Sequence, residues 1–212
     1  MQQPWTTAPL VAFDLEGTGS QDGKHEAILE VGIVPLVDGR PDMARSYQST
    51  VNPGRRIARR PWISPGLTNE SLAGAPPLDA VAPELVARLD GAFIVGHNVA
   101  VDWRLLSRRC PTVRPAALID TLKLAWVAAA SHERSLTALL SAHGLTNEVT
   151  ALVGHETPHR ALWDATGAAL LLAALVGRLP GGSAFTVAHL HHVAGLPLNG
   201  GADATDDALL LF

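Results

Sequence analysis

Two carboxylates, two positions apart, stand at the end of an apolar segment near the start of the chain. Asp14 and Glu16 close the run at 10–16, and a glycine-containing turn follows at 17–19. On an extended strand this spacing places both side chains on one face. Two like charges on a buried face must neutralise or bind a cation. We therefore infer a divalent metal site, against the alternative of an ordinary strand end whose acids point into water.

A third acid, Asp102, has its own local setting. The apolar stretch at 93–96 predicts a short strand, and Asn98 suits the N-cap of the helix that follows. Asp102 comes four residues after Asn98, so it lies one turn along the same helix face and can point over the strand ends. The alternative is a surface acid stabilised by the dipole of its helix.

A histidine and a fourth acid lie at the start of a long apolar helix. Thr157 suits the N-cap and Pro158 the first helical position, which puts His159 in the first turn and Asp164 in the second. Five residues at about 100° each place the two side chains roughly 140° apart. His159 must therefore lean over from the helix start, as a base that swings in beside a fixed carboxylate would.

These settings, in this order, resemble the three exonuclease motifs of the DEDDh branch of the DnaQ-like 3′ to 5′ exonucleases. The resemblance covers residues 9 to 178, including the segments between the motifs. It rests on Asp14-Leu15-Glu16-Gly17-Thr18-Gly19, Ile28-Leu29-Glu30-Val31-Gly32, Asn52-Pro53-Gly54, His97-Asn98 with Asp102, Ile119-Asp120-Thr121-Leu122, Ser135-Leu136-Thr137-Ala138-Leu139, and His159 with Asp164. Four acids, a histidine and their connecting segments together are far more specific than any single short motif.

The resemblance implies a ribonuclease H-like α/β fold, with a mixed five-stranded sheet flanked by helices that gathers the four acids at one edge. It also implies two divalent ions, and an all-oxygen ligand set suits Mg²⁺ or Mn²⁺. Asp14 would bridge both ions, and Glu16 and Asp164 would hold the ion nearer the nucleophile. Asp102 would act through water or the second ion.

The same resemblance implies roles at the substrate. His159 would be the general base that takes a proton from the attacking water, because imidazole titrates near neutral pH. Leu15 and Thr18 would contact the terminal nucleotide through backbone and hydroxyl groups. The implied activity is the release of mononucleotides from single-stranded or frayed 3′ ends, with DNA favoured and a proofreading or repair role. The alternatives are RNA trimming by the same site and a catalytically silent module that binds nucleic acid or a polymerase.

Two positions depart from the family pattern. Gly17 replaces the threonine common after the glutamate, and Trp163 stands where many members have a small or acidic residue. Trp163 is therefore expected to alter how the helix meets the substrate. Trp103, next to Asp102, could stack on a base, although packing is the more frequent role of a tryptophan in such a position.

The elements that must position these residues follow from periodicity and turn signals. We expect strands near 10–16, 27–37, 43–51, 92–96 and 117–120, and helices near 79–90, after 98, and near 121–130, 135–143 and 159–178. With 212 residues, 47% of them hydrophobic, the chain can bury one sizeable core. The expected division is an exonuclease domain at 1–179 and a tail at 180–212. A single cysteine, Cys110, and an N-terminus without signal-peptide features favour a cytoplasmic protein.

The net charge of −4 argues against wrapping long duplex DNA, which needs a strongly basic face. Positive charge is instead concentrated in two clusters, Arg55, Arg56, Arg59 and Arg60 in one loop, and Arg104, Arg108 and Arg109 after Asp102. The first could guide a single-stranded end toward the metals. Solvated surface arginine is an equal alternative for the first cluster and the favoured one for the second.

A dinucleotide-binding dehydrogenase is a rival from another class, suggested by Gly17, Gly19 and Gly23 after a strand. The spacing is not G-x-G-x-x-G, no helix is expected to follow, and two acids would face the pyrophosphate. We therefore reject it. The sequence gives no reason for the loss of activity that a catalytically silent module would require, because all five reacting side chains are present.

The tail contains two features of interest. Thr186 suits the cap of a short helix that carries His189 and His192, which read as a polar face rather than a metal site. The chain ends with Leu209-Leu210-Leu211-Phe212, which resembles the end of bacterial sliding-clamp binding peptides. A sliding clamp or polymerase bound through Leu209, Leu211 and Phe212 is thus a possible partner, against the alternative that the tail folds back onto its own core.

Overall fold

The computed structural model describes residues 3–128 and 133–198. Within this part of the chain, a twisted sheet of seven strands has the order β3-β2-β1-β5-β6-β7, and β4 also pairs with β2. Strands β1, β5 and β6 are parallel to one another, whereas β2, β4 and β7 run antiparallel to their neighbours. The sheet is therefore mixed, as predicted.

The five predicted strands are all present, as β1 (Leu10–Gly17), β2 (Ile28–Val37), β4 (Tyr47–Thr50), β5 (Phe93–Gly96) and β6 (Ala117–Asp120). Two strands of two residues each, β3 (Arg40–Pro41) and β7 (Gly195–Leu196), extend the sheet beyond the predicted five. The third predicted strand was placed too early, because residues 43–45 form a 3-10 turn. The carboxylate of Asp42 starts this turn by accepting a hydrogen bond from the N–H of Ala44.

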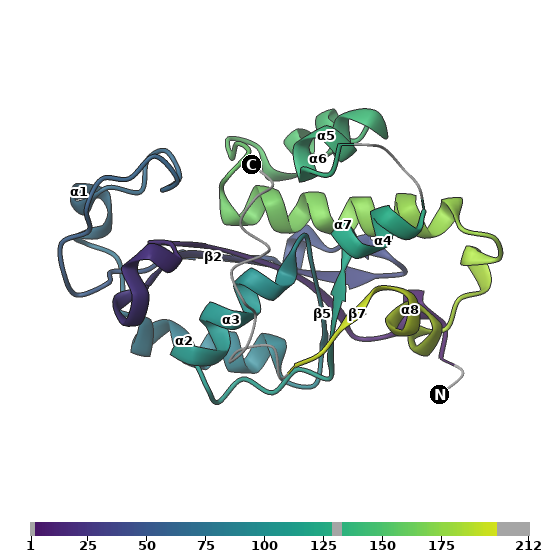
Figure 1. Cartoon of the computed structure of the whole chain (residues 1–212), viewed down its shortest axis with the longest axis horizontal. Helices are drawn as coiled ribbons and strands as arrows, with labels where there is room; N and C mark the ends of the chain where they lie inside the picture. The colour runs from purple at the N-terminus through teal and green to yellow at the C-terminus, as the bar shows by residue number, and fades with distance from the viewer. Residues whose placement is uncertain (1–2, 129–132, 199–212) are drawn as a thin grey trace.

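Helices cover both faces of the sheet (Figure 1). Their bounds are α1 (Asn69–Leu72), α2 (Leu78–Leu89), α3 (Val99–Arg109), α4 (Thr121–Val127), α5 (Leu136–Ala142), α6 (Thr146–Val153), α7 (Ala161–Arg178) and α8 (Val187–Ala194). Helices α2 and α3 pack on one face with a core of their own, and α4 to α8 pack on the other. The short helices α1 and α6 were not predicted. A capping box between Thr68 and Ser71 starts α1, and this signal is present in the sequence.

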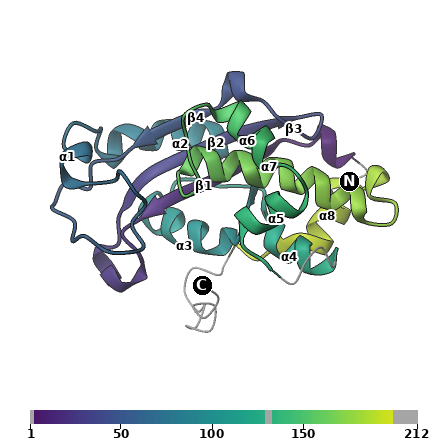
Figure 2. The same cartoon turned by 90° about the horizontal axis from the view of Figure 1, so that it is seen from above.

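Helix α7 organises the second face, and it runs along the sheet beneath α5 and α6 (Figure 2). It is long and apolar enough to cross a membrane by composition alone, but 67% of that span is buried inside the fold. Twelve of its residues contribute to the core, which agrees with the prediction of a core helix. It packs against β1 and β2, and its start lies on Gly32 of β2, the residue that pairs with Asp14 of β1.

The part of the tail that the structure describes adds to the same core. Thr186 caps α8 by accepting a hydrogen bond from the N–H of His189, as predicted. Phe185 and Leu190 are buried in the cluster around α7, and β7 pairs with β6. Residues 180–198 are therefore integrated with the domain. The clamp-binding prediction concerns residues 208–212, which lie outside the described residues.

Candidate active site

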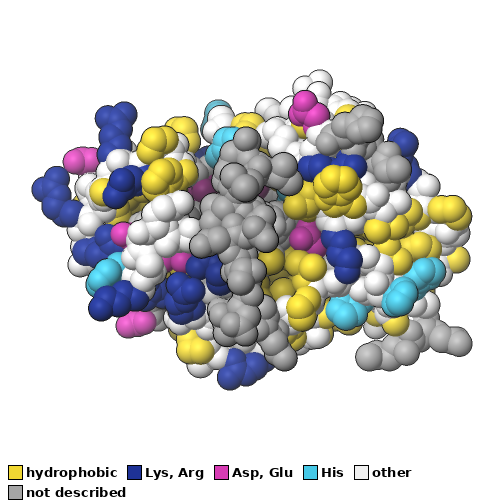
Figure 3. Space-filling view, viewed as in Figure 1, with side chains coloured by type: hydrophobic (Ala, Val, Ile, Leu, Met, Phe, Trp, Pro, Cys, Tyr) yellow, Lys and Arg dark blue, Asp and Glu magenta, His cyan; other side chains and the backbone are white. Residues whose placement is uncertain are grey.

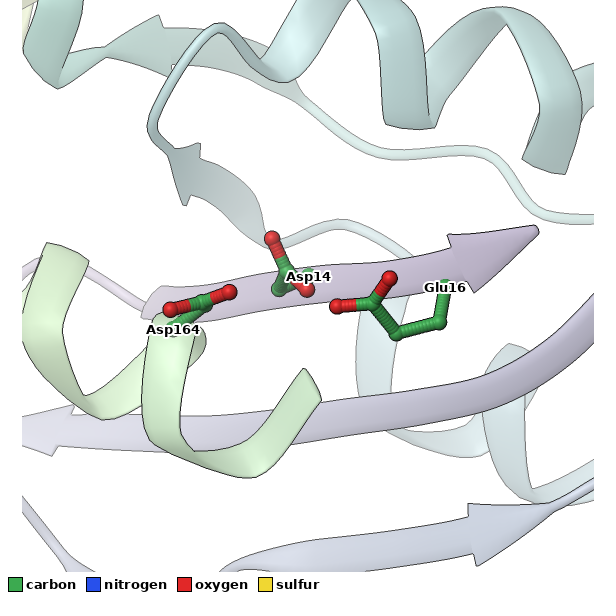
Figure 4. A group of neighbouring side chains, drawn as sticks. All are labelled: Asp14, Glu16 and Asp164. Carbon is green, nitrogen blue, oxygen red and sulfur yellow. The ribbon is translucent and has the colours of Figure 1, made fainter. Parts of the chain in front are cut away.

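Three of the predicted acids come together in the folded chain. Asp14 and Glu16 project from the same face of β1, and Asp164 reaches them from the first turn of α7 (Figure 4). One ligand oxygen from each residue lies within 4.8 Å of the others. Strand and helix thus form one cluster from residues 150 positions apart in the sequence.

A glycine on the neighbouring strand allows this approach. Gly32 of β2 pairs with Asp14 of β1 in the antiparallel register. A Cβ at Gly32 would lie only 2.3 Å from the carbonyl carbon of Ala161, so the start of α7 rests directly on the backbone of β2. The missing side chain therefore determines how near Asp164 can come to Asp14.

Asp102 is buried beside the cluster but is not one of its three closely grouped acids. Its Oδ1 accepts a hydrogen bond of 3.2 Å from the N–H of Leu15, between the two acids of β1. The prediction that Asn98 is the N-cap of this helix is confirmed in position but not in its hydrogen bonding. Asn98 occupies the N-cap position with a left-handed backbone (φ 60°) and no side-chain capping bond. Its own N–H donates to the carboxylate of Asp120 at 3.0 Å, which fixes the turn instead.

Burial and the charges of neighbouring carboxylates raise the pKa values of all four acids. Desolvation is the largest cause in each case, followed for Asp14 by the charges of Asp102 and Asp164. The pKa of Asp14 lies well above its usual range. Burial raises the pKa values of Glu16 and Asp102 to about 8, and that of Asp164 to about 7. A site of this kind holds protons when it lacks a cation.

The cluster fits a divalent cation. Among the described residues, the Oδ2 atom of Asp14 is buried and has no hydrogen-bond partner. A buried carboxylate oxygen without a donor is costly unless a cation compensates it. The three carboxylates supply only oxygen ligands, which hard divalent cations prefer. Asp14, Glu16 and Asp164 are therefore suited to hold a divalent metal.

His159 lies on the loop that leads into α7, not in the helix as predicted. The helix begins at Ala161, after an extended Arg160, and His159 has a left-handed backbone with φ of 65°. The buried carboxylate of Glu30 accepts a hydrogen bond of 3.1 Å from the N–H of Ala161, and it thus caps the start of α7 in place of Thr157. The His159 side chain is exposed, and its backbone N–H binds the Asp164 carboxylate. The loop thus places a histidine directly next to the acidic cluster.

Comparison with known proteins agrees with this geometry. A family model described as exonuclease matches residues 11–172, which include all the acids and the histidine. The chain belongs to this exonuclease family. The match spans β1 to most of α7, so the acidic cluster lies inside the family's shared region.

Curated relatives of this exonuclease include parts of replicative polymerases. The PolC-type DNA polymerase III of Thermotoga petrophila is 33% identical over 164 residues, or 74% of this chain and 11% of the polymerase. The DNA polymerase III subunit epsilon of Aquifex aeolicus is 30% identical over 74% of this chain and 75% of that subunit. The chain spans only 11% to 24% of the length of four of the curated relatives that it matches.

A solved structure supports the fold. Exonuclease X in complex with 5′ overhanging duplex DNA has a TM-score of 0.60 and 25% sequence identity, and the match covers 87% of this chain and 98% of that one. The ribonuclease H-like fold predicted from the motifs is therefore confirmed.

The two residues predicted to contact the terminal nucleotide of the substrate have structural partners. Leu15 is buried in the core below β1, and its N–H is bound to Asp102. The hydroxyl of Thr18 accepts a hydrogen bond of 3.0 Å from the N–H of Ala27. Leu15 directly precedes Glu16 and Thr18 follows it by two positions, on either side of a bulge in the pairing of β1 with β2. Their contact with substrate remains a prediction.

The loop between β4 and α1 adds residues that sequence analysis missed. Ser64 is buried, and its hydroxyl donates a hydrogen bond of 2.5 Å to the Glu16 carboxylate. The indole N–H of Trp62 donates to the carbonyl of Thr18 at 3.1 Å. Glu30 was part of the family resemblance but was given no role. No local signal identifies Ser64, whereas an aromatic residue beside the arginine cluster at 55–60 was a signal for Trp62.

Three further residues, Trp163, Trp103 and Gly17, have roles in packing the exonuclease fold. Trp163 is buried in the core around α7, so its side chain does not face the substrate, and its expected effect on how the helix meets the substrate stays a prediction. Trp103 is also buried, and its indole N–H donates to the carbonyl of Leu198. Gly17 has no room for threonine, because a Cβ there would lie 2.9 Å from a methyl group of buried Leu105.

The two arginine clusters differ in the fold. Arg104 donates two hydrogen bonds, of 2.6 and 2.7 Å, to the buried carboxylate of Glu26, and Arg109 donates to the Glu26 carbonyl. The second cluster thus ties α3 to the segment after β1 and is structural. In the first cluster, Arg56 and Arg60 are exposed. Lysine and arginine side chains gather at the left of Figure 3, the end at which α1 lies.

Proposed function

We propose that this exonuclease hydrolyses the terminal phosphodiester bond at the 3′ end of single-stranded or frayed DNA and releases mononucleotides. The observation that carries the proposal is the cluster of Asp14, Glu16 and Asp164, whose oxygens lie within 4.8 Å, with a buried oxygen of Asp14 left without a donor. The direction is supported by a relative named 3'-5' exonuclease DinG from Bacillus subtilis, 25% identical over 80% of this chain. DNA is favoured because several relatives are DNA polymerase III proteins.

The proposed cofactor is a pair of Mg²⁺ or Mn²⁺ ions, and Asp14 would be a ligand of both. Glu16 and Asp164 would hold one ion, and Asp102 would act on the second or through water. Bound metal supplies charge neutralisation for the attacking and leaving oxygens of an in-line displacement. The raised pKa values of the acids fit this assignment, since the same burial that keeps protons in the site also strengthens its affinity for cations.

His159 is the general base of the proposed reaction. Its imidazole takes one proton from the attacking water as the oxygen bonds to phosphorus, and the bond from phosphorus to the O3′ of the preceding nucleotide breaks. The departing O3′ takes a proton from solvent water. The products are a nucleoside 5′-monophosphate and a strand shortened by one nucleotide with a free 3′ hydroxyl. His159 is exposed on the loop before α7, which leaves its imidazole open to substrate and solvent.

The relatives support a setting for this activity. Proofreading or repair beside a polymerase in the cytoplasm is the setting we propose, because relatives include a subunit and parts of DNA polymerase III. Binding of a sliding clamp by Leu209, Leu211 and Phe212 stays a prediction from the sequence.

The test is a directional degradation assay. A 5′-labelled single-stranded oligonucleotide with Mg²⁺ should yield a ladder that shortens from the 3′ end, and chromatography should show 5′-mononucleotides. Chelator or Asp14→Asn should stop the reaction, while Glu84→Gln on the exposed face of α2 should not. A label released immediately as a mononucleotide would show the opposite polarity and contradict the proposal. A matched RNA strand degraded faster than DNA would shift the assignment to RNA trimming.

A further inference from the structure

Trp62 combines exposure with a fixed orientation. Its side chain is 45% exposed, which is unusual for the largest apolar side chain. At the same time its indole N–H donates to the carbonyl of Thr18 at 3.1 Å. A large aromatic ring held in place while facing solvent is suited to contact a flat ligand, since little side-chain entropy remains to be lost on binding.

The ring lies near the acidic cluster. Thr18, which holds the indole, comes two residues after Glu16, and Ser64, two residues after Trp62, donates to the Glu16 carboxylate at 2.5 Å. A Cβ at Gly19 would lie 2.5 Å from the indole nitrogen, so the ring rests against the turn that ends β1. The loop therefore joins Trp62 to the site at two points.

The loop that carries Trp62 is also fixed at its base. The Asn69 side chain accepts the N–H of Ile57 at 2.8 Å and donates to its carbonyl at 3.0 Å. Ile57 and Leu67 are buried with Leu29 and Leu72 in a small core of their own. Trp62 thus stands on an anchored loop, and its position relative to Glu16 is set before substrate arrives.

Exposed arginines accompany Trp62 in the same loop and leave part of its ring uncovered. The guanidinium of Arg60 lies 5.7 Å from the centre of the Trp62 ring, whereas Arg134 stacks on Trp126 at 4.0 Å. Arg60 is thus at the outer limit of cation–π distance from the ring, and the 45% exposure of Trp62 shows that ring surface remains free. Arg56 and Arg59, in the same loop, are exposed as well. An aromatic face beside exposed arginines is the combination by which proteins bind single-stranded nucleic acid.

We propose that Trp62 stacks on a nucleobase at the 3′ end of the bound strand, while Arg60 attracts the adjacent phosphates. This inference rests on the proposed function and names a substrate contact of the same site. Stacking does not depend on base identity, because every base offers a flat face. Trp62 would therefore hold the strand end near the acids without sequence preference.

The experiment compares Trp62→Ala and Trp62→Phe with wild type on a 5′-labelled single-stranded oligonucleotide. Trp62→Ala should raise KM by about 10-fold or more, within the range measured for stacking on one base, and leave kcat within about twofold. Trp62→Phe keeps a ring but loses the N–H, so it should recover most of the lost affinity. Val37→Ala is the control. Val37 is also exposed, and it lies on β2 beyond Pro35, the partner of Val11 at the far end of β1 from Glu16.

A second substrate separates stacking from a structural role. An oligonucleotide with abasic sites at its last two positions should bind wild type about 10-fold more weakly, and Trp62→Ala should not distinguish it from the intact strand. Equal penalties for wild type and Trp62→Ala would overturn the proposal. A Trp62→Phe variant as impaired as Trp62→Ala, with lowered kcat and unchanged KM, would also overturn it in favour of a hydrogen bond that only supports the turn. An inactive wild type would instead refute the proposed function.

Discussion

Arg160 and Glu30 form a buried ion pair across 130 positions of sequence. The guanidinium donates hydrogen bonds of 2.9 and 2.5 Å to the two carboxylate oxygens of Glu30, whose side chain is 0% exposed. The same carboxylate accepts the N–H of Ala161 and a side-chain N–H of Gln48. Its charge is thus fully satisfied by β4, α7 and the loop before α7. The pair joins β2 to the residue that directly follows His159.

Replacing Arg160 should therefore impair both stability and catalysis. Arg160→Met leaves the buried Glu30 without its cation, and the free energy of unfolding should fall by about 3 kcal/mol in urea denaturation. Because the His159 loop loses its anchor, kcat should fall about 10- to 100-fold with little change in KM. Arg160→Lys keeps the charge but loses the paired geometry, so its effects should be intermediate.

The matched control is Arg55→Met, which removes an arginine from the more exposed pair with Asp22. It should cost at most about 1 kcal/mol, since exposed pairs contribute little. Equal losses of stability for the two arginines would show that the Glu30 pair has no special role.

Gly32→Ala should disturb the site without touching any acid. The new methyl group would meet the backbone of Ala161 at 2.3 Å, and neither strand nor helix start can move aside cheaply. Overpacking of this kind costs about 1–3 kcal/mol, and the displaced α7 should carry Asp164 away from Asp14. Thermal unfolding and turnover at saturating Mg²⁺ measure the two effects. Gly177→Ala in the same helix meets nothing within 4 Å and should be neutral or stabilising, so comparable damage there would refute the packing argument.

The metal-free protein should lose stability as pH rises. Glu16 and Asp102 have pKa values of about 8 in the fold and Asp164 of about 7, whereas unfolded carboxyl groups titrate near 4. Between these limits the folded state holds more protons than the unfolded state, so the free energy of unfolding falls with increasing pH. The contribution is fully present below about pH 4 and is lost as pH passes through 7 to 8.

Asp14→Asn isolates this effect from other titrating groups. The difference in unfolding free energy between wild type and variant, measured in chelator, should shift by about 1–3 kcal/mol toward the variant from pH 5 to pH 8. Mg²⁺ should stabilise wild type most at the high end, because only ionised carboxylates bind the ion. A difference that stays constant across this range would contradict the assignment of repulsion to the acidic cluster.

His159→Ala should separate proton transfer from metal binding. The rate should fall by about 10² to 10⁴, the range for losing a general base, while the affinity for Mn²⁺ measured by calorimetry stays near that of wild type. Asp164→Asn should lower both quantities. If His159→Ala lost metal affinity as Asp164→Asn does, the histidine would be a ligand and the proposed mechanism wrong. His155→Ala, at an exposed position of the same loop, is the control for a histidine change alone.

The sequence by itself determined the identity of the acids and the strand and helices that carry them. The spacing of Asp14 and Glu16 on an apolar strand and the apolar periodicity of α7 are local patterns, so they predicted one face and one helix correctly. These features depend on residues a few positions apart, which a linear reading can detect.

Tertiary structure alone decided where α7 begins beside the site. Thr157 and Pro158 gave a reasonable helix start, but Glu30, brought in from β2, binds the N–H of Ala161 and moves that start three residues later than predicted. A buried carboxylate is satisfied only by donors that the whole fold supplies, and no local pattern encodes which donors these are.

The substrate side of the site was decided in the same way. Trp62 and Ser64 reach the end of β1 across more than 40 positions of sequence, through hydrogen bonds to Thr18 and Glu16. Only the closed loop brings these partners together, because loop residues have no periodicity that fixes their orientation. The acids could therefore be named from the sequence, whereas the groups that orient them, and the ring proposed to contact the substrate, required the fold.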